Sequence, residues 1–346
     1  MQIDTRSIGP DYPPYVIAEL SANHNGNIDQ AFAIMEAAKA AGADAIKIQT
    51  YRADTITIDH DGPEFIIKGG LWDNRRLYDL YEWAHTPWDW HAALFDKARA
   101  LDITLFSSPF DPSAVDLLHE LGAPAFKIAS FELVDLPLIR MVAATGKPMI
   151  MSTGMADQTE IAEGLQAARD AGARDIILLH CVSGYPAPAS DYNLATIPDM
   201  AARFDVMVGL SDHTLDNTAA VTAVGLGAVA IEKHVTLDRN GGGPDDSFSL
   251  EPPELEQLVQ GARTAWEAFG KVDYGLKSSE RANAQFRRSL YVVQDIPAGA
   301  ALTPENIRSI RPGFGLAPKH YEAVLGRRAK VALARGKALS WDALEE

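Results

Sequence analysis

The chain has 346 residues, of which 47% are hydrophobic, and it carries 47 acidic against 31 basic side chains, a formal net charge of −16. This length and apolar content exclude a disordered or fibrous protein and suit one large domain with a small second one. The negative charge opposes binding to nucleic acid or to an anionic membrane surface, so we expect small molecules or copies of the same chain as partners.

Cysteine content and the first residues limit the class of protein further. The single cysteine, Cys181, excludes an intrachain disulfide and a structural zinc site built on several thiolates. The amino-terminal segment has no basic region followed by an apolar one, and no apolar run reaches the length of a membrane span. These features predict a cytoplasmic protein that does not bind a membrane.

Eight short segments rich in Val, Ile and Ala recur through the first three quarters of the chain, and stretches with helical periodicity separate them. The predicted strands are 15–20, 43–50, 103–108, 125–130, 148–153, 175–181, 205–210 and 228–235. Helices are expected between them, for example at 28–41 and 157–171, and a last helix is expected near 253–269. Eight strand–helix units in strict alternation predict an α/β fold, a (β/α)8 TIM barrel, over residues 1–270.

Two further regions depart from the barrel pattern. Residues 51–87 lengthen the connection between the second and third strands, and insertions of this size commonly form part of the active-site roof. Residues 271–286 are polar and are expected to be a linker. Short strands, turns and one short helix then predict a small β-rich domain at 287–346, which is marginal on its own by size.

Polar side chains stand at the ends of all eight predicted strands, where TIM barrels place their active sites. They include Glu19, Lys47, Gln49, Ser108, Lys127, Ser130, Ser152, Ser183, Ser211, His213 and His234, with Glu132 and Tyr185 just beyond. Residues two apart on a strand, such as Lys47 and Gln49, face the same side. A single serine could equally cap its strand, but eight polar ends together predict a polar floor beneath the loops.

His213 and His234 end the seventh and eighth strands, which are neighbours in a barrel. Two imidazoles without a thiolate make an open site that leaves positions for water and substrate oxygens, as suits Mn, Co, Mg or catalytic Zn. A lone histidine is more often structural, but this pair favours a divalent metal.

Lys47 and Lys127 are compatible with two chemistries. A lysine on a barrel strand can form a Schiff base, as in metal-free aldolases, or it can be a fixed cation for phosphate or carboxylate. The serine hydroxyls around the same volume have the composition of a phosphate-binding site, which favours the cation. Glu132 lies on the same side as Ser130 if the strand continues, and is then a candidate general acid or base.

The motifs at these strand ends resemble those of the sialic acid synthase family, most closely its pseudaminic acid branch. The matching segments are AELSANHNG (18–26), GADAIKIQTY (42–51), FSSPFD (106–111), FKIASFE (126–132), KPMIMSTGMA (147–156), SGYPAP (183–188), GLSDHT (209–214), IEKHVTL (231–237), GGPDDSFSLEP (242–252), RRSLYV (287–292) and RSIRPGFGL (308–316). The similarity extends over nearly the whole chain.

The resemblance implies a TIM barrel followed by a small antifreeze-like (β-clip) domain, assembled as a domain-swapped homodimer. It also implies condensation of phosphoenolpyruvate with an open-chain amino-sugar aldehyde and water, which gives a nonulosonic acid and phosphate. The metal, Mn with Co or Mg as alternatives, would be held by His213 and His234.

Roles for individual residues follow from the same resemblance. Phosphoenolpyruvate would be bound by Lys47, Ser108, Lys127, Ser130, Ser152, Ser183 and Ser211. Glu132 would activate water at C2, with Glu19 and Lys127 as further catalytic residues. The expected sugar contacts are Glu19, Gln49, Asn74, Tyr185, Asp245 and Arg311. Arg311 would reach the sugar bound by the other subunit; without the resemblance it would be read as a surface arginine in a loop.

Two departures from typical sialic acid synthases favour the pseudaminic branch, namely Leu20-Ser21 in place of Ala-Gly and Val182-Ser183 in place of Thr-Asn. The expected sugar is then 2,4-diacetamido-2,4,6-trideoxy-altrose. An N-acetylneuraminic or legionaminic acid synthase with the same mechanism, and a metal-free Schiff-base aldolase, stay as alternatives. An ice-binding role is disfavoured because 287–346 has scattered charges and no repeat.

Overall fold

The computed structural model describes residues 1–345, which divide into two compact units, Met1–Gly270 and a second that begins at Lys271. Eight parallel strands of the first unit close into a barrel. They are β3 (Tyr15–Glu19), β4 (Ala45–Thr50), β5 (Thr104–Pro109), β6 (Phe126–Ile128), β7 (Met149–Ser152), β8 (Ile176–Cys181), β9 (Met207–Asp212) and β10 (Ala230–His234). β10 pairs with both β9 and β3, which closes the sheet. The TIM barrel expected from the strand–helix alternation is confirmed.

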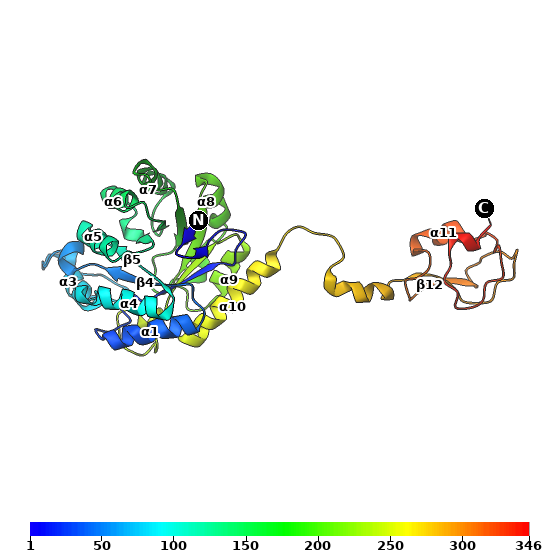
Figure 1. Cartoon of the computed structure of the whole chain (residues 1–346), viewed down its shortest axis with the longest axis horizontal. Helices are drawn as coiled ribbons and strands as arrows, with labels where there is room; N and C mark the ends of the chain where they lie inside the picture. The colour runs from blue at the N-terminus through cyan, green and yellow to red at the C-terminus, as the bar shows by residue number, and fades with distance from the viewer. Residues whose placement is uncertain (346) are drawn as a thin grey trace. The chain divides into compact units, whose positions relative to one another are not determined.

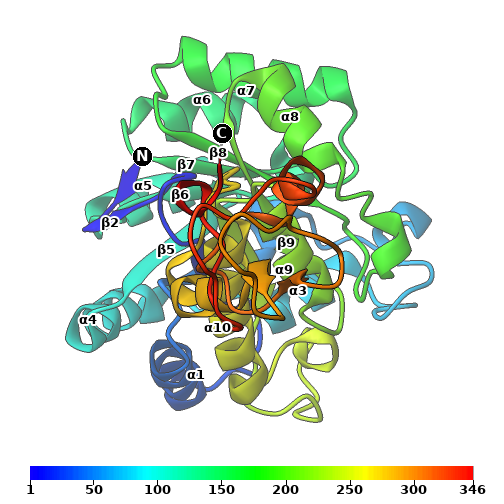
Figure 2. The ribbon, with the colours of Figure 1, turned by 90° about the vertical axis from the view of Figure 1, so that its right-hand side faces the viewer.

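Helices surround the strands on the outside of the barrel (Figures 1 and 2). They are α1 (Ile28–Ala40), α4 (His91–Leu101), α5 (Pro112–Glu120), α6 (Leu136–Ala144), α7 (Gln158–Asp170), α8 (Thr196–Phe204), α9 (Thr218–Gly225) and α10 (Pro252–Phe269). Local chemistry explains where they begin. The Asp157 side chain accepts hydrogen bonds from the backbone N–H groups of Thr159 and Glu160, and the Glu160 side chain accepts one from the backbone N–H of Asp157, a capping box that starts α7.

The barrel interior has an apolar lower layer and a polar upper layer. A short antiparallel hairpin, β1 (Gln2–Ile3) and β2 (Arg6–Ser7), contributes Ile3 to the lower layer. The inward-facing residues of that layer include Ile17, Ala45, Phe106, Ile150, Ile177 and Ala230. Two residues further along these strands come Glu19, Lys47, Ser108, Ser152, Leu179 and Glu232. Strand alternation therefore brings polar side chains to the carboxyl end of the barrel.

The insertion between β4 and β5 is folded rather than irregular. It contains α2 (Ala53–Ile56), η1 (Pro63–Phe65) and α3 (Leu77–Ala84). An antiparallel bridge joins Ile66 to Arg76, and the Arg76 guanidinium also donates to Asp59, Asp61 and Asp79. These contacts hold residues 59–79 together as one substructure.

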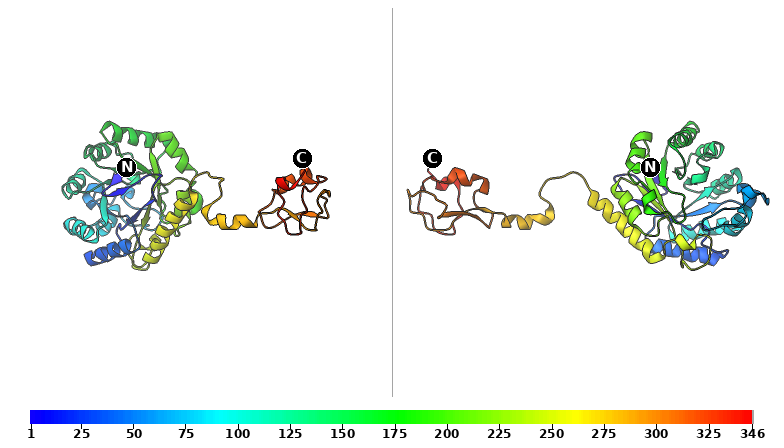
Figure 3. Two further views of the ribbon diagram at one scale, coloured as in Figure 1. Left: turned by 45° about the vertical axis from the view of Figure 1, so that its right-hand side comes forward. Right: turned by 180° about the vertical axis from the view of Figure 1, so that it is seen from behind.

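The second unit is small and consists mainly of loops and short strands (Figure 3). β11 (Ser289–Val292) pairs with β12 (Ile307–Ile310), and α11 (Tyr321–Val324) packs on the same small core. The segment 271–286, expected to be a polar linker, contains a 3-10 helix, η6 (Ser278–Phe286). Within residues 1–345 no helix has the length and apolarity that a membrane crossing needs.

Candidate active site

A cavity of about 510 Å³ lies at the carboxyl ends of the barrel strands, a volume typical of small-molecule sites. Its lining includes most of the side chains singled out from the strand ends, namely Lys47, Gln49, Ser108, Lys127, Ser130, Glu132, Ser152, Tyr185, Ser211, His213, His234 and Asp245. The insertion contributes Tyr51, Trp72, Leu77 and further residues to the same cavity. The expected polar floor and the expected contribution of 51–87 are thus found together.

Two lysines and two glutamates form a buried network at the floor. Lys47 Nζ lies 2.8 Å from Glu232 Oε1 and 3.2 Å from Glu19 Oε2, and Lys127 Nζ lies 3.4 Å from Glu232 Oε2. Burial lowers the pKa of Lys127 to about 8. Burial also disfavours charge on Lys47, but Glu19 and Glu232 outweigh it and raise its pKa. Lys47 is therefore a permanent cation, whereas Lys127 titrates near neutral pH.

The two glutamates of this network differ in charge. Burial raises the pKa of Glu19 to about 6, with Lys47 opposing the rise. Burial would also raise the pKa of Glu232, but Lys127 and Lys47 hold it well below its usual range. Glu232 therefore stays ionised between the two ammonium groups, while Glu19 takes up a proton more readily.

Serine hydroxyls surround the lysines. Among residues 1–345, the buried Oγ atoms of Ser108, Ser152 and Ser183 have no hydrogen-bond partner. Ser211 Oγ donates to Glu232 over 3.2 Å, and Ser130 Oγ accepts from the backbone N–H of Gly154 over 3.2 Å. Buried hydroxyls without partners are uncommon in folded proteins, so those of Ser108 and Ser152, which line the same cavity as the two ammonium groups, indicate a site for a ligand rich in acceptor oxygens.

Glu132 lines the cavity from a position that differs from the expected one. Ser130 and Glu132 would share one side only if the strand continued, but β6 ends at Ile128 and a 3-10 turn, η3 (Ser130–Glu132), follows. The condition is therefore not met, although both side chains do reach the cavity. Burial raises the pKa of Glu132 to about 7, which suits a general base at neutral pH.

His213 and His234 lie side by side, with ring centroids 5.3 Å apart. His213 Nδ1 is 2.9 Å from the Val182 carbonyl oxygen and donates there, so a metal would bind through Nε2. Burial lowers the pKa of His213, but interactions with the Cys181 thiol and the Val182 carbonyl oxygen outweigh burial and raise this pKa. His234 Nδ1 is buried without a partner, and burial holds the pKa of His234 well below its ordinary value. No group of three or more His, Cys, Asp or Glu residues within 1–345 is arranged to hold an ion. The pair thus fits an open metal site that takes its other ligands from water and substrate.

Three of the side chains expected to contact the sugar, Glu19, Gln49 and Asp245, are joined by hydrogen bonds through Ser21. Gln49 Nε2 donates to Glu19 Oε1 over 2.9 Å and to Ser21 Oγ over 3.0 Å, and Ser21 Oγ donates to Asp245. Tyr185 packs on His213 with ring centroids 4.4 Å apart. Glu19 is fully buried and level with Lys47 on the neighbouring strand; it is not part of the cavity lining and contacts two lining residues, Gln49 and Lys47.

Besides Glu19, three of the named residues lie outside the lining of the cavity. Asn74 is exposed, has φ +64° and donates to Asp73. Ser183 Oγ and Ser130 Oγ both face the side of Gly154 on which a Cβ atom would stand. Arg311 belongs to the second unit, directly after β12.

Some residues of the site carry no role in the sequence analysis. Glu232 binds both lysines, and its place two residues before His234 on β10 is the signal that puts it inside the barrel. Trp72 lines the cavity, whereas Asn74 does not. The sequence of the insertion has no periodic pattern that would predict which of these two side chains faces the cavity. The Tyr192 hydroxyl accepts the backbone N–H of His213 over 2.6 Å, a contact with no sequence signal.

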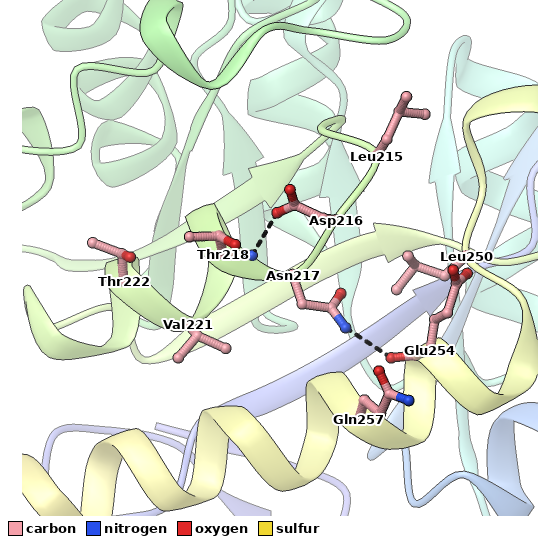
Figure 4. Close-up of a pocket in the computed structure, with 9 residues that line it drawn as sticks. All are labelled: Leu215, Asp216, Asn217, Thr218, Val221, Thr222, Leu250, Glu254 and Gln257. Atoms are coloured by element: carbon pink, nitrogen blue, oxygen red, sulfur yellow. Dashed lines mark hydrogen bonds between the residues drawn. The ribbon is translucent and has the colours of Figure 1, made fainter.

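A second cavity, of about 430 Å³, lies between α9 and α10 (Figure 4). Its lining includes Asp216, Asn217 and Glu254, and the Asn217 side chain donates to the Glu254 carbonyl oxygen over 2.9 Å. The lining contains two carboxylates and no lysine, arginine or histidine. It therefore lacks the cations that an anionic substrate needs, and the cavity at the strand ends remains the candidate active site.

Fold and site together define a TIM-barrel enzyme with its polar centre at the carboxyl ends of the strands. A model of the NeuB family matches residues 34–274, and a model of the SAF (antifreeze-like) domain matches residues 287–345. The chain belongs to the NeuB family and carries a SAF domain after its barrel.

Known relatives match nearly the whole length of the chain. The pseudaminic acid synthase of Campylobacter jejuni is 44% identical over 329 residues, which cover 95% of this chain and 96% of that protein. The pseudaminic acid synthase of Helicobacter pylori is 42% identical over 334 residues, with 96% and 98% covered. The crystal structure of the spore coat polysaccharide biosynthesis protein spsE from Bacillus subtilis is similar with a TM-score of 0.68, 34% identity and coverage of 100% and 99%.

Proposed function

We propose that this protein is a nonulosonic acid synthase that makes pseudaminic acid. It condenses phosphoenolpyruvate with 2,4-diacetamido-2,4,6-trideoxy-altrose and water and releases phosphate. The proposal is supported by the relatives at 42–44% identity, both named as pseudaminic acid synthases. Its main structural support is the set of partnerless serine hydroxyls around Lys47 and Lys127, which suits the phosphate and carboxylate oxygens of phosphoenolpyruvate.

The chain's own residues can be assigned to the steps of this reaction. Lys47, Lys127 and the serines bind and orient phosphoenolpyruvate so that its C3 faces the sugar aldehyde. C3 forms a bond to the aldehyde carbon, and the aldehyde oxygen takes up a proton. Glu132, with a pKa of about 7, accepts a proton from the water that adds at C2. The C2–O bond to phosphate then breaks as the new C2 hydroxyl passes its proton to the departing phosphate, which leaves the keto acid and inorganic phosphate.

His213 and His234 would hold a divalent metal, most suitably Mn, with Co or Mg as alternatives. The open two-histidine set and the neutral state of His234 support this assignment. Such an ion would act as a Lewis acid toward the sugar aldehyde. Gln49, Tyr185 and Asp245 lie on the cavity side of the pair and would orient the sugar.

The SAF domain has a role in this proposal that the barrel alone does not provide. We expect a domain-swapped homodimer in which Arg311 of one subunit reaches the N-acyl group of the sugar bound by the other. Arg311 lies at the end of β12, where the small core of the second unit holds the backbone.

The cytoplasmic location of the protein stays a prediction.

Product analysis tests the proposal directly. The protein is incubated with phosphoenolpyruvate, Mn²⁺ and either the altrose derivative, the legionaminic acid precursor or N-acetylmannosamine, and phosphate release and product mass are recorded. The altrose derivative should give the largest kcat/KM. A larger kcat/KM with another sugar would make the protein a legionaminic or N-acetylneuraminic acid synthase. If none of the three sugars gave phosphate release, the protein would not be a synthase of this kind.

A further inference from the structure

The insertion presents an apolar wall to the active-site cavity. In α3 the cavity-lining residues are Leu77, Leu80, Tyr81 and Ala84, which stand at positions i, i+3, i+4 and i+7 of the helix. This spacing places them on one face of the helix. Ile56, the last residue of α2, lines the same cavity. So does Ile67, which directly follows the bridge residue Ile66. We call Ile56, Ile67, Leu77, Leu80 and Ala84 the apolar wall.

Packing fixes this wall to the barrel. The Tyr51 ring, directly after β4, meets Tyr81 of α3 edge to face at 5.7 Å between ring centroids. The same ring meets Phe110, just after β5, at 5.1 Å. Tyr51 is only 3% exposed, so it forms a rigid joint between barrel and insertion.

A hydrogen bond joins the loop between the bridged residues Ile66 and Arg76 to the loop after β10. Trp72 Nε1 donates to the Pro244 carbonyl oxygen over 3.0 Å, directly before Asp245. Its ring lies 5.6 Å from that of Tyr185. On the outer side, Arg76 binds three aspartates and keeps the charged residues of the insertion in solvent. The apolar face is thus oriented toward the cavity by contacts on both sides.

The wall contrasts with the rest of the cavity. The lysines, serines and histidines belong to the barrel strands and their ends, and all of the wall residues belong to the insertion. Condensation fixes the aldehyde carbon of the sugar next to phosphoenolpyruvate, among the polar groups. The remainder of an open-chain sugar must then occupy other parts of the same cavity. A hydroxyl group placed against Leu77 or Ala84 would lose water without gaining a partner.

We propose that the apolar wall is the subsite for the apolar end of the sugar and selects the substrate class. It accepts the methyl group of a deoxy sugar carbon and the methyl groups of N-acyl substituents, and it rejects sugars with a hydroxymethyl end. This inference rests on the proposed synthase activity and adds the part of the protein that distinguishes one amino sugar from another.

Two sugars that differ at one position test the subsite. The full-length enzyme is assayed with 2,4-diacetamido-2,4,6-trideoxy-altrose and with its 6-hydroxy counterpart, at saturating phosphoenolpyruvate. The wild type should favour the deoxy sugar by about tenfold or more in kcat/KM, within the range that an apolar pocket gives against an added hydroxyl. Leu77→Asn keeps the side-chain size but adds polar atoms, and should reduce that ratio to near one, mainly through a higher KM for the deoxy sugar.

The control and a second variant come from the same helix. Glu82 is exposed and absent from the cavity lining, so Glu82→Gln should keep the wild-type ratio. Ala84→Ser introduces one hydroxyl into the wall with little change in volume, and decides the question if Leu77→Asn does not fold. Thermal melting establishes folding of each variant.

The outcomes separate the subsite from the synthase activity. A wild-type enzyme that uses both sugars equally, or folded wall variants that keep the wild-type ratio, would overturn the subsite while the synthase activity stands. A wild-type enzyme that forms no product from either sugar would overturn the proposed function itself.

Discussion

Lys233 and Asp212 form an ion pair with 2.8 Å between Nζ and Oδ2, and their side chains are 1% and 0% exposed. Lys233 alternates on β10 with Glu232 and His234, which line the cavity, so it faces the other side of the sheet. Its ammonium group also donates to the carbonyl oxygens of Thr214 and Asp216, over 2.6 and 2.7 Å. The pair therefore holds the backbone on both sides of His213.

Removal of Lys233 should destabilise the barrel strongly. Lys233→Met leaves the Asp212 carboxylate buried without its counter-charge, which typically lowers the free energy of unfolding by about 3–5 kcal/mol. Urea unfolding followed by circular dichroism measures the change. Arg203→Met, which breaks the exposed pair with Asp199, is the control and should leave the midpoint almost unchanged. Equal midpoints for Lys233→Met and the wild type would contradict the assignment.

Gly154 should be essential for phosphoenolpyruvate binding. A Cβ atom at this position would lie 2.3 Å from Ser183 Oγ and 2.8 Å from Ser130 Oγ, so Gly154→Ala must displace both hydroxyls. We expect the KM for phosphoenolpyruvate to rise about tenfold or more, as loss of one or two hydrogen bonds to a charged group predicts. Gly225→Ala in α9 meets no neighbour within 4 Å and is the matched control. If both variants keep the wild-type KM, the two serines do not bind this substrate.

The pH dependence of kcat/KM should be bell-shaped. Glu132 must be deprotonated to accept a proton, so activity should fall as the pH drops below its pKa of about 7. Lys127 must be charged to bind the anion, so activity should also fall as the pH rises above its pKa of about 8. Glu132→Gln should lower kcat by about 10²–10⁴-fold and remove the acidic limb. An unchanged acidic limb in this variant would assign that limb to another group.

Metal dependence separates the synthase from the Schiff-base aldolase. Activity should be lost with EDTA and restored by Mn²⁺, and His234→Ala should weaken Mn²⁺ binding, measured by electron paramagnetic resonance, by more than about 100-fold. His119→Ala, at an exposed position of α5, should bind Mn²⁺ normally. The lowered pKa of Lys127 is what a Schiff-base lysine would require. A borohydride-trapped adduct on Lys127, formed with full activity in EDTA, would favour the aldolase.

Much of the fold was predictable because each strand and helix is recognisable locally. All eight predicted strands occur within a few residues of their expected ends, since each is a short apolar run followed by a helical pattern. The boundary of α7 was also readable, because Asp157 caps the helix through its own side chain. The amino-terminal hairpin was not predicted, since its two-residue strands give no periodic signal.

The direction of a side chain was predictable where strand geometry alone decides it. Lys47, Ser108, Ser211 and His213 reach the cavity as the alternation on their strands requires. Strand alternation does not explain the position of Glu132, because β6 stops at Ile128 and a turn follows. The local sequence does not indicate where a strand ends and a turn begins inside such a polar segment.

The sequence by itself determined the barrel, the two-unit organisation and the polar residues of the strand ends, because hydrophobic periodicity and strand alternation are local properties. Only the tertiary structure decided how those residues interact. Glu232 binds Lys47, 185 positions earlier in the chain, and Lys233 binds Asp212 on the neighbouring strand. It also placed Trp72 and Leu77, rather than Asn74, at the cavity, because the direction of side chains in a folded insertion depends on packing against Tyr51 and the loop after β10.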